Sequence, residues 1–167
     1  MQAICLQTCF SLDIREYQND AKNIVIDETV RKEIMEETAT RTDFSSLVSK
    51  CHRGPRTRGV ERKEFVFADG TKGDVYRALL LAMSADPSLP MNRDAISRRI
   101  ADVCVNDTPQ MSSVYSACNQ LANMALDMYP EQRVVEWEPD DKVLNIVDPY
   151  FLFHLRWSTR LSALAER

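Results

Sequence analysis

Residues 92–125 read NRDAISRRIADVCVNDTPQMSSVYSACNQLANMA, and this stretch predicts two amphipathic helices joined by a short turn. Asn92 is a good N-cap for the first helix, whose apolar residues recur at spacings of three and four. The turn contains Val105, which is expected to fill the junction between the helices. Thr108 and Pro109 then restart a helix as N-cap and first helical residue. Two such helices, with another helix before them, are typical of the helix-turn-helix motif.

The flanking segments extend this pattern to a winged helix-turn-helix domain. An amphipathic segment that begins after Asp74 supplies the preceding helix. Segments rich in β-forming residues at 134–137 and 143–147, separated by a turn, predict a hairpin. An aromatic helix that begins at Pro149 follows the hairpin directly. We therefore expect a winged-helix domain with an aromatic C-terminal helix at 64–167.

Residues 1–63 have a different character. Helix-start chemistry after Asp27 and again after Asp43 predicts two short helices. The segment RGPRTRGVERK at 53–63 is a strongly basic connector, and its composition favours a solvated linker over a phosphate-binding loop. The expected organisation is a helical N-terminal arm with a basic connector at 1–63, in a mostly helical α+β chain.

The composition is that of a globular protein. The chain has 167 residues, of which 44% are hydrophobic and 28% charged, enough for one domain or a domain with an arm. No run approaches the ~20 apolar residues of a membrane span, and residues 1–12 lack the features of a signal peptide. The five scattered cysteines favour reduced thiols. We expect a cytoplasmic protein with no membrane partner.

The sequence carries no signature of a catalytic, metal or cofactor site. It contains neither a GxxxxGK[ST] nucleotide loop nor a G-x-S-x-G nucleophile elbow. Cys5 and Cys9 have the spacing of half a metal site, but no matching Cys or His pair follows. His154 lies in an aromatic run and is expected to pack rather than to catalyse. The expectation is a protein that is not an enzyme and binds no cofactor.

The C-terminal segment resembles a known family. It matches the C-terminal winged-helix domain of bacterial and archaeal P-loop ATPases of the STAND/AAA-like type through Ile146, Asp148, Pro149, Tyr150, Phe151, Phe153, Leu155, Arg156 and Trp157. Residues 74–82 resemble the first winged-helix segment of that family, and the likeness covers about the last hundred residues. The resemblance implies a winged helix that is either a fragment of a larger ATPase or a stand-alone relative. It also implies that the helices at 28–51 correspond to the family's lid helices.

One function that the sequence predicts is DNA binding. The helix from Pro109 to Leu126 would then lie in the major groove, where amide side chains pair with adenine edges. Its candidates for base contacts are Gln110, Ser112, Ser113, Ser116, Asn119, Gln120 and Asn123. The candidates for phosphate contacts are Arg93, Arg98, Arg99, Arg56, Arg58, Arg62 and Lys63. The net charge of −4 excludes a surface that is basic throughout, although it allows a local basic stripe.

The alternative is a protein-interaction module that docks on a P-loop ATPase core or a partner subunit. The turn of the hairpin is acidic and would repel a phosphate backbone, and an uncharged helix is common at the centre of an interface. The candidates for this interaction are Glu138, Asp140, Asp141, Tyr150, Arg156 and Trp157. Either function is compatible with a homodimer, which nothing in the sequence requires.

Overall fold

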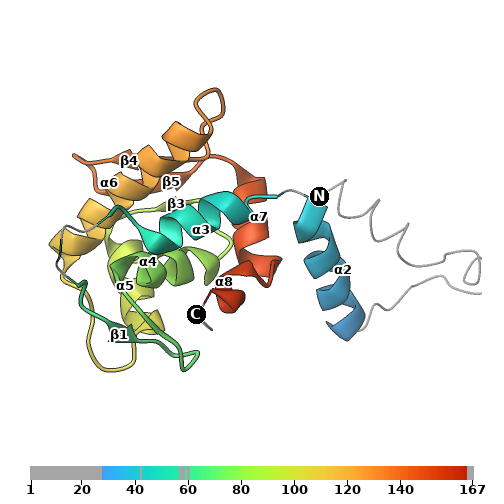
Figure 1. Ribbon diagram of the computed structural model, residues 1–167, viewed down its shortest axis with the longest axis horizontal. Coiled ribbons are helices and arrows are strands. Elements are labelled where there is room, and N and C mark those ends of the chain that lie inside the picture. Colours follow the sequence, from blue (N-terminus) through green and yellow to red (C-terminus); the bar gives the residue numbers. More distant parts are fainter. Residues whose placement is uncertain (1–27, 42, 57–58, 60, 165–167) are drawn as a thin grey trace, which may run out of the picture.

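The structure, a computed structural model, describes residues 28–41, 43–56, 59 and 61–164. This part of the chain forms seven helices and two small antiparallel sheets, which confirms the predicted mostly helical α+β class (Figure 1). The helices are α2 (Glu28–Arg41), α3 (Ser45–Arg53), α4 (Val75–Ser84), α5 (Arg93–Val103), α6 (Met111–Met128), α7 (Pro149–Trp157) and α8 (Arg160–Ala163). The strands are β1 (Phe65–Val66), β2 (Lys72–Gly73), β3 (Pro90–Met91), β4 (Val135–Glu138) and β5 (Val143–Ile146).

Helix α4 lies at the centre of the core and packs on α3, α5, α6 and α7. Asp74 caps it, because the carboxylate accepts hydrogen bonds from the backbone amides of Tyr76 and Arg77. Every residue from Tyr76 to Met83 except Leu81 is buried. A helix that is covered on nearly all sides in this way belongs to the interior of a domain.

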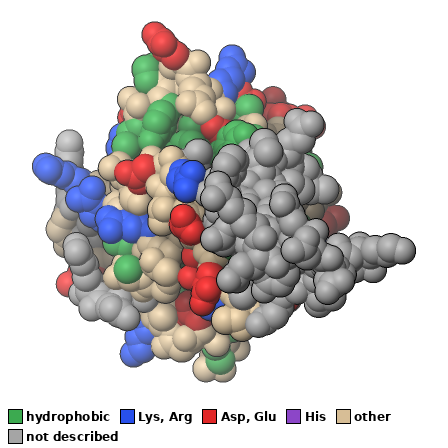
Figure 2. All heavy atoms as spheres, turned by 90° about the vertical axis from the view of Figure 1, so that its right-hand side faces the viewer, with side chains coloured by type: hydrophobic (Ala, Val, Ile, Leu, Met, Phe, Trp, Pro, Cys, Tyr) green, Lys and Arg blue, Asp and Glu red, His purple; other side chains and the backbone are tan. Residues whose placement is uncertain are grey.

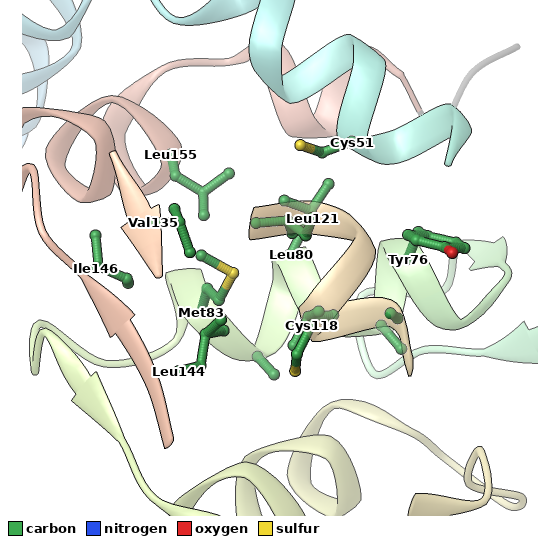
Figure 3. Close-up of a cluster of buried hydrophobic side chains, with 14 of the residues drawn as sticks. Cys51, Tyr76, Leu80, Met83, Cys118, Leu121, Val135, Leu144, Ile146 and Leu155 are labelled. Atoms are coloured by element: carbon green, nitrogen blue, oxygen red, sulfur yellow. The ribbon is translucent and has the colours of Figure 1, made fainter. Parts of the chain in front are cut away.

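The other elements pack their apolar side chains around this central helix. In Figure 3, Leu121 of α6, Leu155 of α7 and Leu144 of β5 belong to one buried cluster with Leu80 and Met83 of α4. Helix α6 contacts both α4 and β4, so it lies between the central helix and the sheet. These contacts hold α6 in a fixed position beside β4.

The larger sheet has the strand order β3-β5-β4. Strands β4 and β5 form the hairpin that the sequence predicts, with Glu136 opposite Asn145 and Trp137 opposite Leu144. Strand β3, which comes from the segment between α4 and α5, is not among the elements that the sequence predicts. It has only two residues, one of them Pro90, so its sequence carries no strand periodicity.

The small sheet of β1 and β2 holds the turn between α5 and α6. The carbonyl of Val66 accepts a hydrogen bond from the amide of Val105 at 2.9 Å, and Phe67 forms a β-bridge with Cys104. This backbone pairing leaves the Val105 side chain 54% exposed, whereas Phe67 is buried. The prediction that Val105 fills the junction between the helices is therefore wrong.

Helix α6 begins and ends two residues later than the helix that the sequence predicts from Pro109 to Leu126. Its N-cap is Gln110, which has an extended backbone and makes no side-chain capping bond. The amide of Val114 donates to the Gln110 carbonyl at 3.1 Å. Pro109 is buried ahead of the helix, so burial of its ring rather than its preference for the first helical position fixes its place.

Helix α3 contributes to the same core as the C-terminal elements. Leu47, Val48 and Cys51 are fully buried in that cluster, and α3 packs on α4, α6 and α8. Helix α2 contacts α7 instead (Figure 1). The expected boundary between 63 and 64 thus does not separate two hydrophobic cores. Among the helices described, none is long and apolar enough to span a membrane.

Candidate interaction face around helix α6

Helix α6 turns a polar face to the solvent, which is uncharged over its first three turns. Its opposite side is buried in the core through Val114, Cys118 and Leu121. The residues predicted to contact bases lie on the outer side, where Gln110, Ser112, Ser113, Ser116, Asn119 and Asn123 are exposed and Gln120 is half-buried. From Gln110 to Asn123 this face presents hydroxyl and amide groups, and one turn further on it ends at the exposed carboxylate of Asp127.

Arg99 does not lie on the outer surface of α5, contrary to the prediction that it contacts phosphates. Its side chain is buried, and Nη2 forms an ion pair with Oδ1 of Asp86 at 3.1 Å. Arg99 follows Ile96 by one turn and precedes Ile100, so it lies beside the apolar stripe of the helix. A phosphate cannot reach a guanidinium in this position without a rearrangement of the fold.

Arg62 of the connector is also engaged within the fold. Its Nη1 donates to Oδ2 of Asp74 and to the carbonyl of Arg53, both at 2.7 Å. Nη2 donates to the carbonyl of Pro55, and the guanidinium lies 4.7 Å from the ring centroid of Tyr76. The connector is therefore attached to the N-terminus of α4 rather than free to follow a ligand.

The other connector residues predicted to contact phosphates differ in their surroundings. Lys63 forms an exposed ion pair with Asp107. Arg56 is exposed and has no ion pair with a described residue. Arg58 lies outside the described residues. The basic connector thus contributes less free positive charge near α6 than its sequence indicates.

Two other cations flank the N-terminal half of α6. Arg93 and Lys142 line a cavity of about 310 Å³ together with Met111 and Tyr115. Lys142 lies in the hairpin turn with a φ of +54°, and its Nζ lies 5.6 Å from the ring centroid of Tyr115. Arg93 is exposed, as is Arg98 further along α5. These three cations have no ion pair within the described part of the chain.

The end of the β4–β5 hairpin is acidic. Glu138, Asp140 and Asp141 are all exposed, as the sequence predicts for an acidic turn. The Oε1 atom of Glu138 accepts a hydrogen bond from Nδ2 of Asn145 across the hairpin. The acidic groups outnumber Lys142 at this end of the sheet, which disfavours contact with a polyanion.

A groove of about 350 Å³ separates the outer side of α6 from β4. Helix α6 contributes Ala122, Asn123 and Leu126 to its wall, and β4 contributes Val135 and Trp137. Leu126 is 53% exposed although it lies on the polar side of the helix. Strand β4 is at the edge of the sheet, so one side of its backbone has no partner strand in the described structure.

Aromatic stacking fixes the wall of this groove. The rings of Tyr115 on α6 and Trp137 on β4 stack with centroids 5.6 Å apart and an interplanar angle of 25°. Both side chains are half-buried. The contact holds α6 and β4 at a defined separation, so the groove is a built feature of the fold.

The predicted interaction residues on α7 do not belong to this groove. Tyr150 is exposed, whereas Arg156 and Trp157 are half-buried. Nη1 of Arg156 is buried without a hydrogen-bond partner. None of the three lines the groove between α6 and β4. The six predicted interaction residues therefore lie in two separate places, three in the hairpin and three on α7.

The sequence does not predict the structural role of a buried arginine on α4. Arg77 is 1% exposed, and its Nη1 donates to the carbonyl of Leu161 at 3.0 Å. Its Nε and Nη2 donate to Oγ1 of Thr71 at 3.1 and 2.9 Å, and Nη2 lies 3.5 Å from Oδ2 of Asp69. Arg77 thus joins α4, the β1–β2 turn and α8. The only signal in the sequence is a single arginine in an otherwise apolar helix.

The two histidines have structural surroundings. Nε2 of His52 lies 3.4 Å from Nη1 of Arg77, and the pKa of His52 is lowered by burial and by the Arg77 charge. His154 is buried, and its Nδ1 lies 2.9 Å from the carbonyl oxygen of Ala39. It packs α7 against α2, in agreement with the packing role that the sequence predicts.

The described cysteines are inert. Cys51, Cys104 and Cys118 are free and buried, and burial raises the pKa of Cys51 and Cys118 to about 12. Cys5 and Cys9 lie outside the described residues. Within the described ranges, no group of three or more His, Cys, Asp or Glu side chains is placed to hold a metal ion.

Comparison of the chain with protein-family models, with curated proteins and with solved structures gives no match.

Proposed function

We propose that this chain is a winged-helix module that binds another protein through the face formed by α6 and β4. The order of helix, strand, two helices and hairpin, from α4 to β5, is that of a winged helix-turn-helix domain. The sheet order β3-β5-β4, in which the short first strand pairs with the last strand of the hairpin, supports this assignment. Helix α6 is then the helix that contacts the ligand, and β4 and β5 form the wing.

The observation that carries the proposal is the groove between α6 and β4. It combines an exposed leucine, Leu126, with the open edge of a strand. Apolar side chains and unpaired strand edges bind other polypeptides, whereas contacts to nucleic acid depend on cations and amide groups. The depletion of charge on the adjoining face of α6 is also typical of the centre of a protein interface.

The distribution of charge supports a protein partner over DNA. DNA binding requires cations that are free to neutralise phosphates. Arg99 and Arg62 are ion-paired within the fold, and Lys63 pairs with Asp107. On the face shown in Figure 2, most Lys and Arg side chains lie at the left, Asp and Glu side chains lie mainly near the centre, and hydrophobic side chains gather toward the upper end.

The resemblance of residues 146–157 to the STAND/AAA-like ATPases indicates which class of protein this module binds. It makes a P-loop ATPase core, or a subunit that carries one, the protein that the module recognises. The acidic hairpin turn, with Glu138 at the border of the groove, would contribute to that recognition. The role is regulation or recognition without a catalytic step in this chain.

DNA binding is the second candidate, because Arg93 and Lys142 lie beside the N-terminal half of α6 and Arg98 is exposed on α5. Arg93, Arg98 and Lys142 have no ion pair with any residue that the structure describes. The uncharged amides of α6 could then face base edges. A binding measurement separates this candidate from the first.

Two experiments test the proposal. A photoreactive amino acid at Asn123 should give an adduct with a second protein in the native cells, whereas the same amino acid at Ser162 on α8 should not. The adduct should be lost in Leu126→Glu and retained in Val105→Glu, a control at an equally exposed valine outside the groove. A labelled random duplex should show no micromolar binding at ~50 or ~200 mM salt. Salt-sensitive micromolar binding that requires Arg93 and Arg98 would instead establish the DNA candidate.

A further inference from the structure

We propose that the groove binds an extended segment of the partner in which apolar and basic residues alternate, added as a strand to the free edge of β4. This inference rests on the proposed function and deepens it, because it specifies the form in which the partner is recognised. It follows from the hydrogen-bonding register of the sheet, from the side chains along the groove and from their charges.

The register of the hairpin leaves the backbone of two β4 residues without a strand partner in the described part of the chain. The amide of Val147 donates to the carbonyl of Val134 at 2.9 Å, and Glu136 is opposite Asn145 two residues further along. Hydrogen-bonded pairs alternate along an antiparallel ladder. The residues between them, Val135 and Trp137, therefore direct their N–H and C=O groups away from β5 and toward the open edge.

The other side of β5 agrees with this register. The amide of Ile146 donates to the carbonyl of Leu89 at 3.1 Å, on the β3 side of the sheet. Ile146 is the residue opposite Val135, so the pair does not exchange hydrogen bonds with each other. Trp137 is half-buried, and its donor and acceptor are positioned for a further strand, whereas Val135 is only 4% exposed, so pairing with Val135 requires the side chains that cover it to move.

The side chains along the edge specify alternate residues of that strand. Val135 and Trp137 face α6, so residues paired with them would lie over Ala122 and Leu126 in the groove. An apolar side chain in this position gains free energy by covering Leu126, which is half exposed, whereas a polar side chain would not. The neighbouring residues of the added strand would lie on the opposite face of the sheet.

The acidic residues of β4 determine which residues of the added strand are favourable on the opposite face of the sheet. Glu136 and Glu138 border the groove, and cross-strand pairs of opposite charge are favourable. Arg133 pairs with Glu136, which leaves Glu138 and the adjoining Asp140 and Asp141 without a cation partner among the described residues. Lysine or arginine is therefore expected at the positions between the apolar residues.

The same charges disfavour the other occupants of the groove. Two copies of this chain paired through β4 would bring Glu136 and Glu138 of one copy against those of the other, and like charges in cross-strand positions are destabilising. A nucleic acid would meet the same carboxylates. A basic extended peptide is the occupant whose charge is complementary.

The probe for this inference is the fluorescein-labelled peptide KVKVK, with two valines to pair with Val135 and Trp137. It should bind the full chain, and the charge-reversed peptide EVEVE should bind at least tenfold more weakly. We expect the peptide to run antiparallel to β4, so that the valine amides donate to β4 and their methylation weakens binding by about tenfold or more. Methylation of the lysine amides, which face away from β4, should leave the affinity within about twofold and is the matched control.

Two protein variants locate the binding at the groove. Leu126→Glu should weaken KVKVK at least tenfold, whereas Val105→Glu should not change its affinity. Glu138→Lys should weaken KVKVK and strengthen EVEVE. Circular dichroism of each variant checks that the fold is retained.

Each outcome counts for or against the inference. Equal binding of the two methylated peptides overturns strand addition. A preference for EVEVE, tighter binding of duplex DNA than of KVKVK, or self-association that Leu126→Glu abolishes overturns the basic peptide as the occupant. If KVKVK does not bind but Asn123 still crosslinks to a partner, the strand-addition inference is wrong while the proposed function stands. If both experiments fail, the proposed function is wrong as well.

Discussion

Two arginines are buried in the described part of the chain, and the regions around them differ. Arg77, at the junction of α4, the β1–β2 turn and α8, donates to the carbonyl of Leu161 and to the hydroxyl of Thr71. Arg99, on α5, has a single ion pair with Asp86, and its Nε and Nη1 are buried without acceptors. Burial alone therefore does not reveal what an arginine contributes, since the acceptors around it decide this.

The positions of the two arginines also have a consequence for function. Neither buried guanidinium can contact a ligand at the surface, although the sequence predicts that Arg99 does. Between α6 and β4, by contrast, Leu126 and the edge of the sheet remain uncovered by described residues. A face that the fold itself does not complete is the place where a partner contributes most.

The largest expected effect is that of Arg77→Met. The variant keeps the volume of the side chain but leaves the Leu161 carbonyl and the Thr71 hydroxyl without their donor. The free energy of unfolding should fall by about 3 kcal/mol, as measured by urea denaturation. Arg98→Met, at an exposed position on α5, is the control and should change it by less than about 0.5 kcal/mol. Similar stabilities of the two variants would show that Arg77 does not hold α4, the β1–β2 turn and α8 together.

The connector provides the second test, because two adjacent cations differ in their surroundings. Arg62→Ala removes the partly buried ion pair with Asp74 and two hydrogen bonds to carbonyls, so we expect a loss of about 1.5 kcal/mol. Lys63→Ala removes only an exposed ion pair with Asp107 and should cost less than about 0.5 kcal/mol. Urea denaturation of both variants measures the difference. Equal losses would mean that the connector is not attached to α4 through Arg62.

Arg99 provides the third test and the sharpest contrast with Arg77. Arg99→Met removes two buried N–H groups that lack acceptors, while Asp86 remains partly exposed and can be hydrated. The free energy of unfolding should therefore change by less than about 0.5 kcal/mol or increase slightly. A loss as large as that of Arg77→Met would contradict the view that acceptors, rather than burial, set the contribution of each arginine.

Local signals explain why much of the fold could be predicted. The sequence predicts Asn92 as an N-cap and predicts helices that begin after Asp74 and at Pro149, and Asp74, Asn92 and Asp148 each accept a hydrogen bond from a backbone amide at the start of their helix. Capping and apolar spacing act over a few neighbouring residues, so one sequence suffices to identify them. Strand β3 and the late start of α6 depend on contacts with distant residues and could not be found in this way.

The candidate site was less predictable, because long-range contacts create it. Arg98 and Arg99 are adjacent in the sequence, yet one is exposed and the other is buried against Asp86. The groove exists only because folding brings α6 beside β4. The one local signal for it was Leu126, an apolar residue on the polar side of a helix.

The smallest expected effect is a dependence of stability on pH in the Arg77 region. Burial and the nearby Arg77 charge lower the pKa of His52 in the folded chain. As the pH falls through the ordinary histidine value of about 6.5, the unfolded chain takes up the proton before the folded chain does. The free energy of unfolding should therefore decrease on going from pH 7.5 to pH 5.5. In His52→Gln, whose amide oxygen can still accept from Arg77, this decrease should be smaller in urea denaturation at the same pH values. The same decrease in both proteins would mean that His52 does not sense the Arg77 charge.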